Sequence, residues 1–282
     1  MTAARLPWRT RGALQLRPRS LAVVVAVTLV GIGAFLWPLF IGFGPSSTDH
    51  AQDAPWIFLV MVPLLLLVVA VEIADGGMDA KAVALLGVLA GICAILRPIT
   101  GGLTGVQLMF FLMIPAGRVF GAGFGFVLGN VAMFASAALT GGGGPWLPFE
   151  MLAAGWVGMF AGTLPPLRGR AELWMLTAYS MFAGIAYGFV LNLWFWPFSQ
   201  SNVGAGAAAT FVHGAPLAEN LRRWISYSEA TSLGFDVPRG LSTAAAMLII
   251  GAPILRALRR ASRRAAFDSA PEFVRDVVTA DT

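Results

Sequence analysis

The chain has 282 residues, of which 57% are hydrophobic and only 12% are charged. Soluble domains carry roughly 25% charged residues. A mean hydropathy of +0.76 is typical of integral membrane proteins. This composition excludes a soluble globule, a disordered chain and a coiled coil, and the 33 glycines show no collagen period. We therefore expect an all-α fold, a polytopic bundle of membrane-spanning helices.

Proline, glycine and charged residues divide the apolar sequence into segments. The stretch 107–140 would measure about 51 Å as one helix, well beyond a bilayer core of roughly 30 Å, so Pro115 and Gly117 are expected to break it. We expect about eight transmembrane helices, at residues 21–43, 55–74, 79–96, from 107 to the break at 117–121, 120–140, 148–164, 171–196 and 239–258. One more short helix fits within 215–232, inside a long external segment 198–238.

The segments group into four parts. A basic tail (1–20) precedes two additional N-terminal helices (21–78), a six-helix core (79–258) and a charged C-terminal tail (259–282). With the N-terminus inside, only Arg97, Arg222, Arg223 and Arg239 of the 19 basic residues lie on the outer side. The positive-inside rule then predicts that both termini lie in the cytoplasm. We expect a multi-pass protein of the bacterial plasma membrane.

Most enzymatic and metal chemistry finds no support in these residues. The run Gly141–Gly144 is not followed by Lys-Ser/Thr, so no Walker A loop is present. His50 and His213 lie in predicted external loops, Cys93 is the single cysteine, and no carboxylate pair lies in the middle of a span. We expect no catalytic residue, metal or cofactor. The net charge of +5 is explained by topology rather than by binding to nucleic acid.

Large aromatic side chains gather on the predicted outer side, with a few polar residues between them. An aromatic belt at the membrane interface explains such a set, and so does a solute pocket with a few directional polar groups. Glu150 fits equally a capping role at the start of its helix and a contact with solute. The candidate substrate-binding residues are Arg97, Gln107, Phe110, Phe111, Trp146, Phe149, Glu150, Asn192, Trp196, Trp224 and Tyr227.

Small residues recur at helical spacing in two places. Gly87, Ala90, Gly91 and Ala94 share one side of the helix 79–96, and Gly121, Gly125 and Gly129 mark the helix 120–140. Such stripes let a second helix approach closely. One stripe suits packing inside the bundle, and the other suits docking of another protein.

Residues 79–258, about two thirds of the chain, resemble the substrate-binding S component of energy-coupling factor (ECF) vitamin transporters. The resemblance rests on the six-helix core with both ends inside, on the Ala-xxx-Ala motif at 90–94, and on the run Gly142-Gly143-Gly144-Pro145-Trp146-Leu147-Pro148-Phe149. This run is similar to a subgroup that includes proposed cobalamin importers. The two N-terminal helices and the long segment 198–238 depart from the family pattern.

The resemblance implies a binding subunit rather than an enzyme. It would capture a vitamin-sized solute, with cobalamin as one candidate, and dock through Gly87, Ala90, Gly91 and Ala94 on a membrane T component driven by two cytosolic ATPases. A non-transporting membrane scaffold is the alternative. A secondary transporter has less support because a relay of carboxylates is missing from the spans.

Overall fold

The computed structural model describes residues 18–40, 80–101, 105–198, 206–212 and 214–265. Across these ranges the chain forms α-helices and short 3₁₀ turns, with no strand, so the predicted all-α class is confirmed. The helices are α1 (Pro18–Phe40), α3 (Ala80–Gly101), α4 (Met109–Phe120), α5 (Ala122–Thr140), α6 (Leu147–Thr163), α7 (Gly169–Phe195), α8 (Leu217–Thr231) and α9 (Leu233–Ala265).

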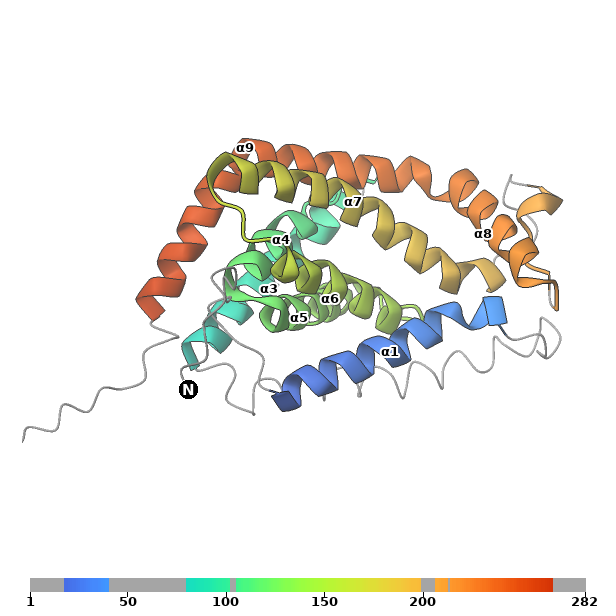
Figure 1. Cartoon of the computed structure of the whole chain (residues 1–282), viewed down its shortest axis with the longest axis horizontal. Helices are drawn as coiled ribbons and strands as arrows, with labels where there is room; N and C mark the ends of the chain where they lie inside the picture. The colour runs from blue at the N-terminus through green and yellow to red at the C-terminus, as the bar shows by residue number, and fades with distance from the viewer. Residues whose placement is uncertain (1–17, 41–79, 102–104, 199–205, 213, 266–282) are drawn as a thin grey trace, which may run out of the picture.

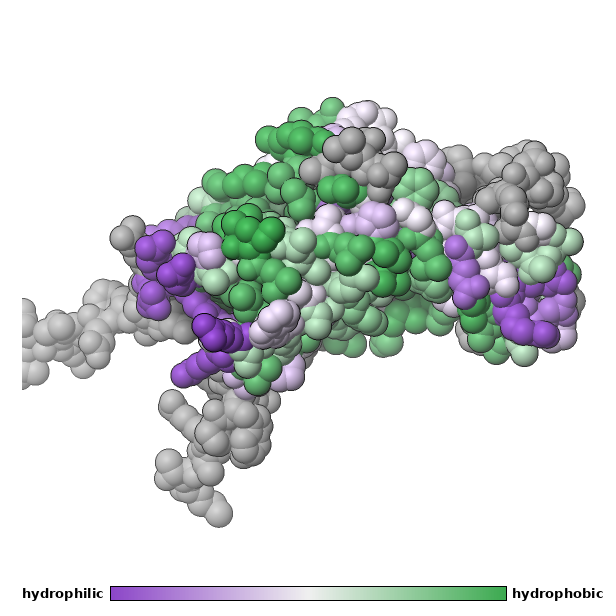
Figure 2. Space-filling view, turned by 90° about the horizontal axis from the view of Figure 1, so that it is seen from above, coloured by the Kyte–Doolittle hydropathy of each residue, from purple (hydrophilic) through white to green (hydrophobic). Residues whose placement is uncertain are grey.

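Four of these helices, α3, α5, α7 and α9, are long and apolar enough to cross a membrane. Shorter apolar stretches lie in α1 and α4. Figure 2 shows a hydrophobic surface along most of the long axis, with hydrophilic side chains gathered toward its two ends. An apolar band between polar ends is the surface that a bilayer requires, so the chain is a helical membrane bundle.

Helices α7 and α9 lie side by side and run antiparallel, since Gly184 of α7 abuts Gly240 of α9 and Leu173 lies by Gly251. In Figure 1 this pair covers one side of the central helices, and α1 runs along the other side. The short helix α8 lies where α7 ends and α9 begins. We call this the α8 end, and the end where α9 terminates the opposite end.

The central helices touch backbone to backbone. A Cβ atom added to Gly125 of α5 would meet the Gly158 carbonyl of α6 and the Gly117 Cα of α4. Farther along the same interface, Gly129 of α5 faces the Ala154 carbonyl of α6. The glycine stripe of α5 therefore serves packing inside the bundle, one of the two roles considered for such stripes.

The four small residues of the stripe on α3 do not share one environment: the two alanines are buried and the two glycines are not. Ala90 and Ala94 are 2% and 0% exposed and pack into the bundle's own core. Gly87 and Gly91 have open space beside them, with no neighbouring atom within 4 Å of an added Cβ. Of the predicted docking residues, only the two glycines are accessible from outside this chain.

Three predicted boundaries were wrong, two of them at prolines. Helix α3 does not end at Leu96 but continues through Pro98 to Gly101, and α9 spans Leu233–Ala265 rather than 239–258. Each of Pro98 and Pro238 removes one backbone hydrogen bond without ending its helix. The part of the external segment from Leu233 onward is thus helical.

The remaining boundaries agree with the structure to within a few residues for α5, α6, α7 and α8. Helix α9 also contains Pro253, and its ribbon bends in its C-terminal part (Figure 1). A proline inside a helix is the usual cause of such a bend. The predicted helix 55–74, residues 1–17 of the basic tail and most of the C-terminal tail lie outside the described residues.

The Gly158 contact can be tested by adding one methyl group. Gly158→Ala should lower the free energy of unfolding by about 1–3 kcal/mol because the added Cβ collides with the Gly125 backbone. The matched control is Gly33→Ala in α1, where an added Cβ meets no atom within 4 Å. Chemical unfolding in detergent would compare the two variants. Equal stability of both would contradict the backbone contact.

Candidate solute-binding site

A polar cavity of about 220 Å³ lies at the α8 end of the bundle. Five parts of the chain supply its walls: the last turns of α3, the segment before α4, the first turn of α6, the C-terminal half of α7, and the region where α9 begins. The lining residues are Arg97, Gln107, Glu150, Tyr187, Gly188, Leu191, Asn192, Phe195, Ser232, Phe235, Asp236 and Arg239. Two arginines face two carboxylates, so the formal charges cancel.

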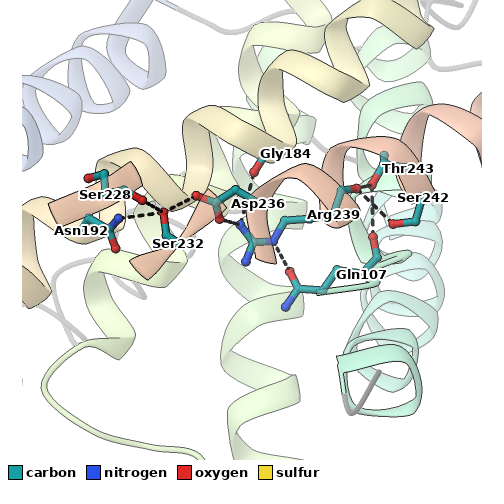
Figure 3. A network of polar contacts seen from close by, with 9 residues as sticks. All are labelled: Gln107, Gly184, Asn192, Ser228, Ser232, Asp236, Arg239, Ser242 and Thr243. Atoms are coloured by element: carbon teal, nitrogen blue, oxygen red, sulfur yellow. Dashed lines mark hydrogen bonds and ion pairs between the residues drawn. The ribbon is translucent and has the colours of Figure 1, made fainter. Parts of the chain in front are cut away.

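The most buried charges of the cavity are Arg239 and Asp236, three residues apart on α9 (Figure 3). Arg239 Nη1 donates to Asp236 Oδ1 over 2.6 Å, and the residues are 9% and 1% exposed. Arg239 Nε donates to Gln107 Oε1 over 2.9 Å, and Nη1 also reaches the Gly184 carbonyl at 3.2 Å. The guanidinium lies 5.2 Å from the centre of the Tyr187 ring, a cation–π distance. Three parts of the chain thus stabilise one buried cation.

The Asp236 carboxylate extends this network toward α7. Ser232 Oγ donates to Asp236 Oδ2 over 2.6 Å, and Asn192 Nδ2 donates to Ser232 Oγ over 2.8 Å. Figure 3 shows these side chains in a row along the start of α9, from Asn192 to Thr243. Thr243 Oγ1 lies 3.1 Å from the Gln107 carbonyl, which ties the segment before α4 to α9.

A second ion pair borders the cavity and is more open to solvent. Arg97 Nη2 donates to both carboxylate oxygens of Glu150, at 3.1 and 3.0 Å, and the side chains are 22% and 12% exposed. The N-terminus of α6 has no side-chain cap, so Glu150 binds Arg97 rather than capping its own helix. Arg97 Nε and Nη1 make no hydrogen bond to any residue that the structure describes. These N–H groups could donate hydrogen bonds to oxygen atoms of a solute.

Glycine at position 188 makes room for the network. A Cβ at Gly188 of α7 would overlap the Asp236 carboxylate, and one at Gly184 would meet the backbone of Gly240. The local sequence of α7 therefore has small residues where the polar side chains of α9 approach. Tyr187, between these two glycines, fills the adjacent space with its ring and packs on Phe110 at 4.8 Å between centroids.

The structure divides the predicted site residues into two groups. Arg97, Gln107, Glu150 and Asn192 come together around the cavity. The predicted aromatic residues do not line it. Phe110 and Phe111 are buried in α4, and Phe110 reaches the site only through Tyr187.

The other aromatic residues hold the α8 end together. Phe149 packs on Trp194, whose ring also lies near Trp146. Trp196 is 1% exposed, and its Nε1 donates to the Ala209 carbonyl over 2.7 Å. Tyr227 belongs to the same small buried cluster, and Trp224 packs against it. These contacts are packing within the bundle.

The sequence interpretation missed Asp236, Arg239 and Ser232. Placing residues up to 238 in an external loop made Asp236 a solvated charge and Arg239 a boundary residue. A helix continued through Pro238 would have put an Asp-x-x-Arg pair inside a candidate span, and an ionisable pair there is a functional candidate by default. Tyr187, which also lines the cavity, was not among the predicted site residues.

The cavity lining combines polar and apolar side chains. No group of three or more His, Cys, Asp or Glu side chains able to hold a metal occurs among the residues that the structure places. Cys93 is buried in α3, where its thiol lies 3.7 Å from the Met109 carbonyl. Guanidinium, amide and hydroxyl groups lie beside the apolar side chains of Phe195, Phe235 and Leu191. In small-molecule sites such polar groups fix the orientation of the ligand, and the apolar side chains supply most of the contact.

Comparison of the chain with protein-family models, with curated proteins and with solved structures finds no match.

Removing Asp236 from its buried ion pair with Arg239 should lower the free energy of unfolding far more than breaking an exposed ion pair. Asp236→Ala leaves Arg239 buried without its carboxylate and should lower the free energy of unfolding by about 3–5 kcal/mol. Glu219→Ala, the matched control, removes the partner of Arg223 on α8, where the side chains are 39% and 24% exposed. Its effect should be about 0.5 kcal/mol. Thermal unfolding in detergent measures both, and similar losses would argue against a buried network.

Proposed function

We propose that this chain is a solute-binding membrane subunit, the S component of an ECF-type importer. The observation that carries the proposal is the polar cavity at the α8 end, in which charged and amide side chains from five parts of the bundle converge. Buried ionisable groups in a membrane protein are costly to maintain, and they commonly mark a substrate path. Arg97, on the more open side of the cavity, would donate to the solute through Nε and Nη1, which bind none of the described residues.

The size of the cavity restricts the solute. Sites for drug-sized ligands usually measure roughly 300–1,000 Å³, and this cavity measures about 220 Å³. A corrin ring is larger than the space, so we do not extend the proposal to cobalamin. A compact solute with oxygen acceptors and a flat or apolar part fits both the donors and the rings of Phe195 and Phe235.

Orientation follows from the distribution of arginines. Arg118, Arg168, Arg170 and the arginines of the last turns of α9 belong to the opposite end, and they support a cytoplasmic position for it. The cavity then opens toward the outside. This arrangement suits an importer that takes its solute from the medium of a bacterial cell.

Coupling to a T component would use the open side of α3. A Cβ added at Gly87 or Gly91 meets no described atom within 4 Å, and the neighbouring side chains of Val88, Ile92 and Ile95 are exposed. A helix of another membrane protein could approach the α3 backbone closely there. Because the sequence has no Walker A loop, the energy for uptake would come from separate cytosolic ATPases.

Solute retention tests the binding role. Protein purified in mild detergent should carry a stoichiometric small molecule, detectable by mass spectrometry of the extracted contents. Arg97→Gln should weaken retention by roughly tenfold to a hundredfold because a charge-assisted hydrogen bond is lost. Arg223→Gln is the control, since it removes a paired arginine at the same end outside the cavity. A protein that stays empty with a panel of vitamins would favour the scaffold alternative.

Coupling is tested separately. Gly87→Leu and Gly91→Leu add bulk on this side of α3, where a Cβ at either position meets no atom of the described residues within 4 Å. The double variant should retain solute as the unmodified protein does and lose uptake in cells. Normal uptake by the double variant would rule out docking through this face. Substitutions at Ala90 and Ala94 cannot serve here because both side chains are buried.

A further inference from the structure

A second cavity, of about 440 Å³, lies on the C-terminal part of α9, at the opposite end from the solute cavity. Its lining consists of Pro253, Arg256, Arg259, Arg260 and Arg263. Four of these five residues carry a positive charge. The proposed solute-binding role uses none of them.

Only one of the four arginines is neutralised within the described part of the chain. Arg259 Nη2 donates to both oxygens of Glu172, at 2.7 and 2.8 Å. The same carboxylate accepts from Arg118 Nε over 2.8 Å and is 1% exposed, so it has no room for a further partner. Arg256, Arg260 and Arg263 form no ion pair with the residues that the structure describes, and their side chains are exposed. Counting the described residues alone, the cavity therefore has an excess of three positive charges.

The arginines of the cavity lie on the same face of α9 as exposed apolar residues. Ile249, Pro253, Arg256, Arg260 and Arg263 follow one another at intervals of four and three residues, which places them on one face of α9. Ile249 is 77% exposed and belongs to the apolar band of a predicted span. Figure 2 shows hydrophilic side chains at one end meeting the hydrophobic surface directly. Along this face, a lipid-facing side chain is followed within two turns by arginine.

This face matches the chemistry of a phospholipid. Acyl chains would lie along the apolar part at Ile249, and a phosphate would meet the arginines, which bind phosphate through several N–H donors at once. The helix dipole also favours cations near a C-terminus. It does not explain why one cavity is lined by four of them. A free phosphate would use the arginines but leave the continuous apolar face without a role.

We propose that the cavity formed by Arg256, Arg259, Arg260 and Arg263 binds the headgroup of an anionic phospholipid of the cytoplasmic leaflet. Basic pockets at the membrane surface bind such headgroups in general. Arg259, held by Glu172, provides a fixed wall, and the three unpaired arginines supply the phosphate donors. The site stands apart from the solute cavity, so it does not depend on the proposed transport role.

Competition between lipids tests the proposal. The full chain in detergent would be titrated with phosphatidylglycerol, phosphatidylcholine and inorganic phosphate, and bound lipid counted by native mass spectrometry. The cavity variant is Arg256→Gln/Arg260→Gln/Arg263→Gln, which leaves the Arg259–Glu172 pair intact. The control variant is Lys81→Gln/Arg168→Gln/Arg170→Gln, which removes the same charge from exposed residues at the same end, outside the cavity.

We expect one phosphatidylglycerol to bind the unmodified protein in preference to phosphatidylcholine. Because the cavity variant loses three charge-assisted donors to the phosphate, it should bind about a hundredfold more weakly. The control variant should bind almost as the unmodified protein does. Equal weakening in both variants would overturn the proposal, because it would show general attraction to a basic surface. Equal binding of phosphatidylcholine, or of inorganic phosphate at the same concentration, would overturn the lipid assignment.

Discussion

Helices in a bilayer gain little hydrophobic free energy by leaving lipid for one another, so close packing and interhelical polar contacts must hold the bundle together. In this protein the closest packing occurs where glycine allows two backbones to touch. Gly117, Gly125 and Gly158 bring α4, α5 and α6 into one compact centre. Gly184 and Gly240 do the same for α7 and α9. A side chain at any of these positions would separate the helices that build the rest of the structure.

The polar cavity depends on that contact between α7 and α9. Because the two helices meet at Gly184, the Asp236 carboxylate lies directly against Gly188, and Arg239 reaches the Gly184 carbonyl and the Tyr187 ring. A buried guanidinium in a low-dielectric region needs each of these partners, and it needs them at fixed distances. The glycines therefore provide both the packing and the geometry in which charge can be buried.

The two ends of the bundle use arginine in different ways. At the α8 end, Arg97 and Arg239 are each balanced by a carboxylate, and the cavity between them has no net formal charge. At the opposite end, Glu172 ties together Arg118 of α4 and Arg259 of α9. Arg256, Arg260 and Arg263 of α9 pair with no carboxylate among the residues that the structure describes. A neutral polar cavity suits selection of a solute, whereas an excess of positive charge suits attraction of anionic lipid.

Composition and hydropathy alone determined the class of this protein, the extents of α5, α6 and α7 to within a few residues, and the gathering of polar residues such as Arg97, Gln107, Glu150 and Asn192 toward one end. These properties are local, since an apolar segment and its charged flank are neighbours in the chain. The tertiary structure decided that Ala90 and Ala94 face inward, and that Trp196 packs under the α8 segment. It also decided that Asp236 and Arg239 lie within a helix beside Gly188. Such outcomes depend on which residues meet across helices far apart in sequence, and hydropathy summed along a single segment contains no information about the partner of a polar group.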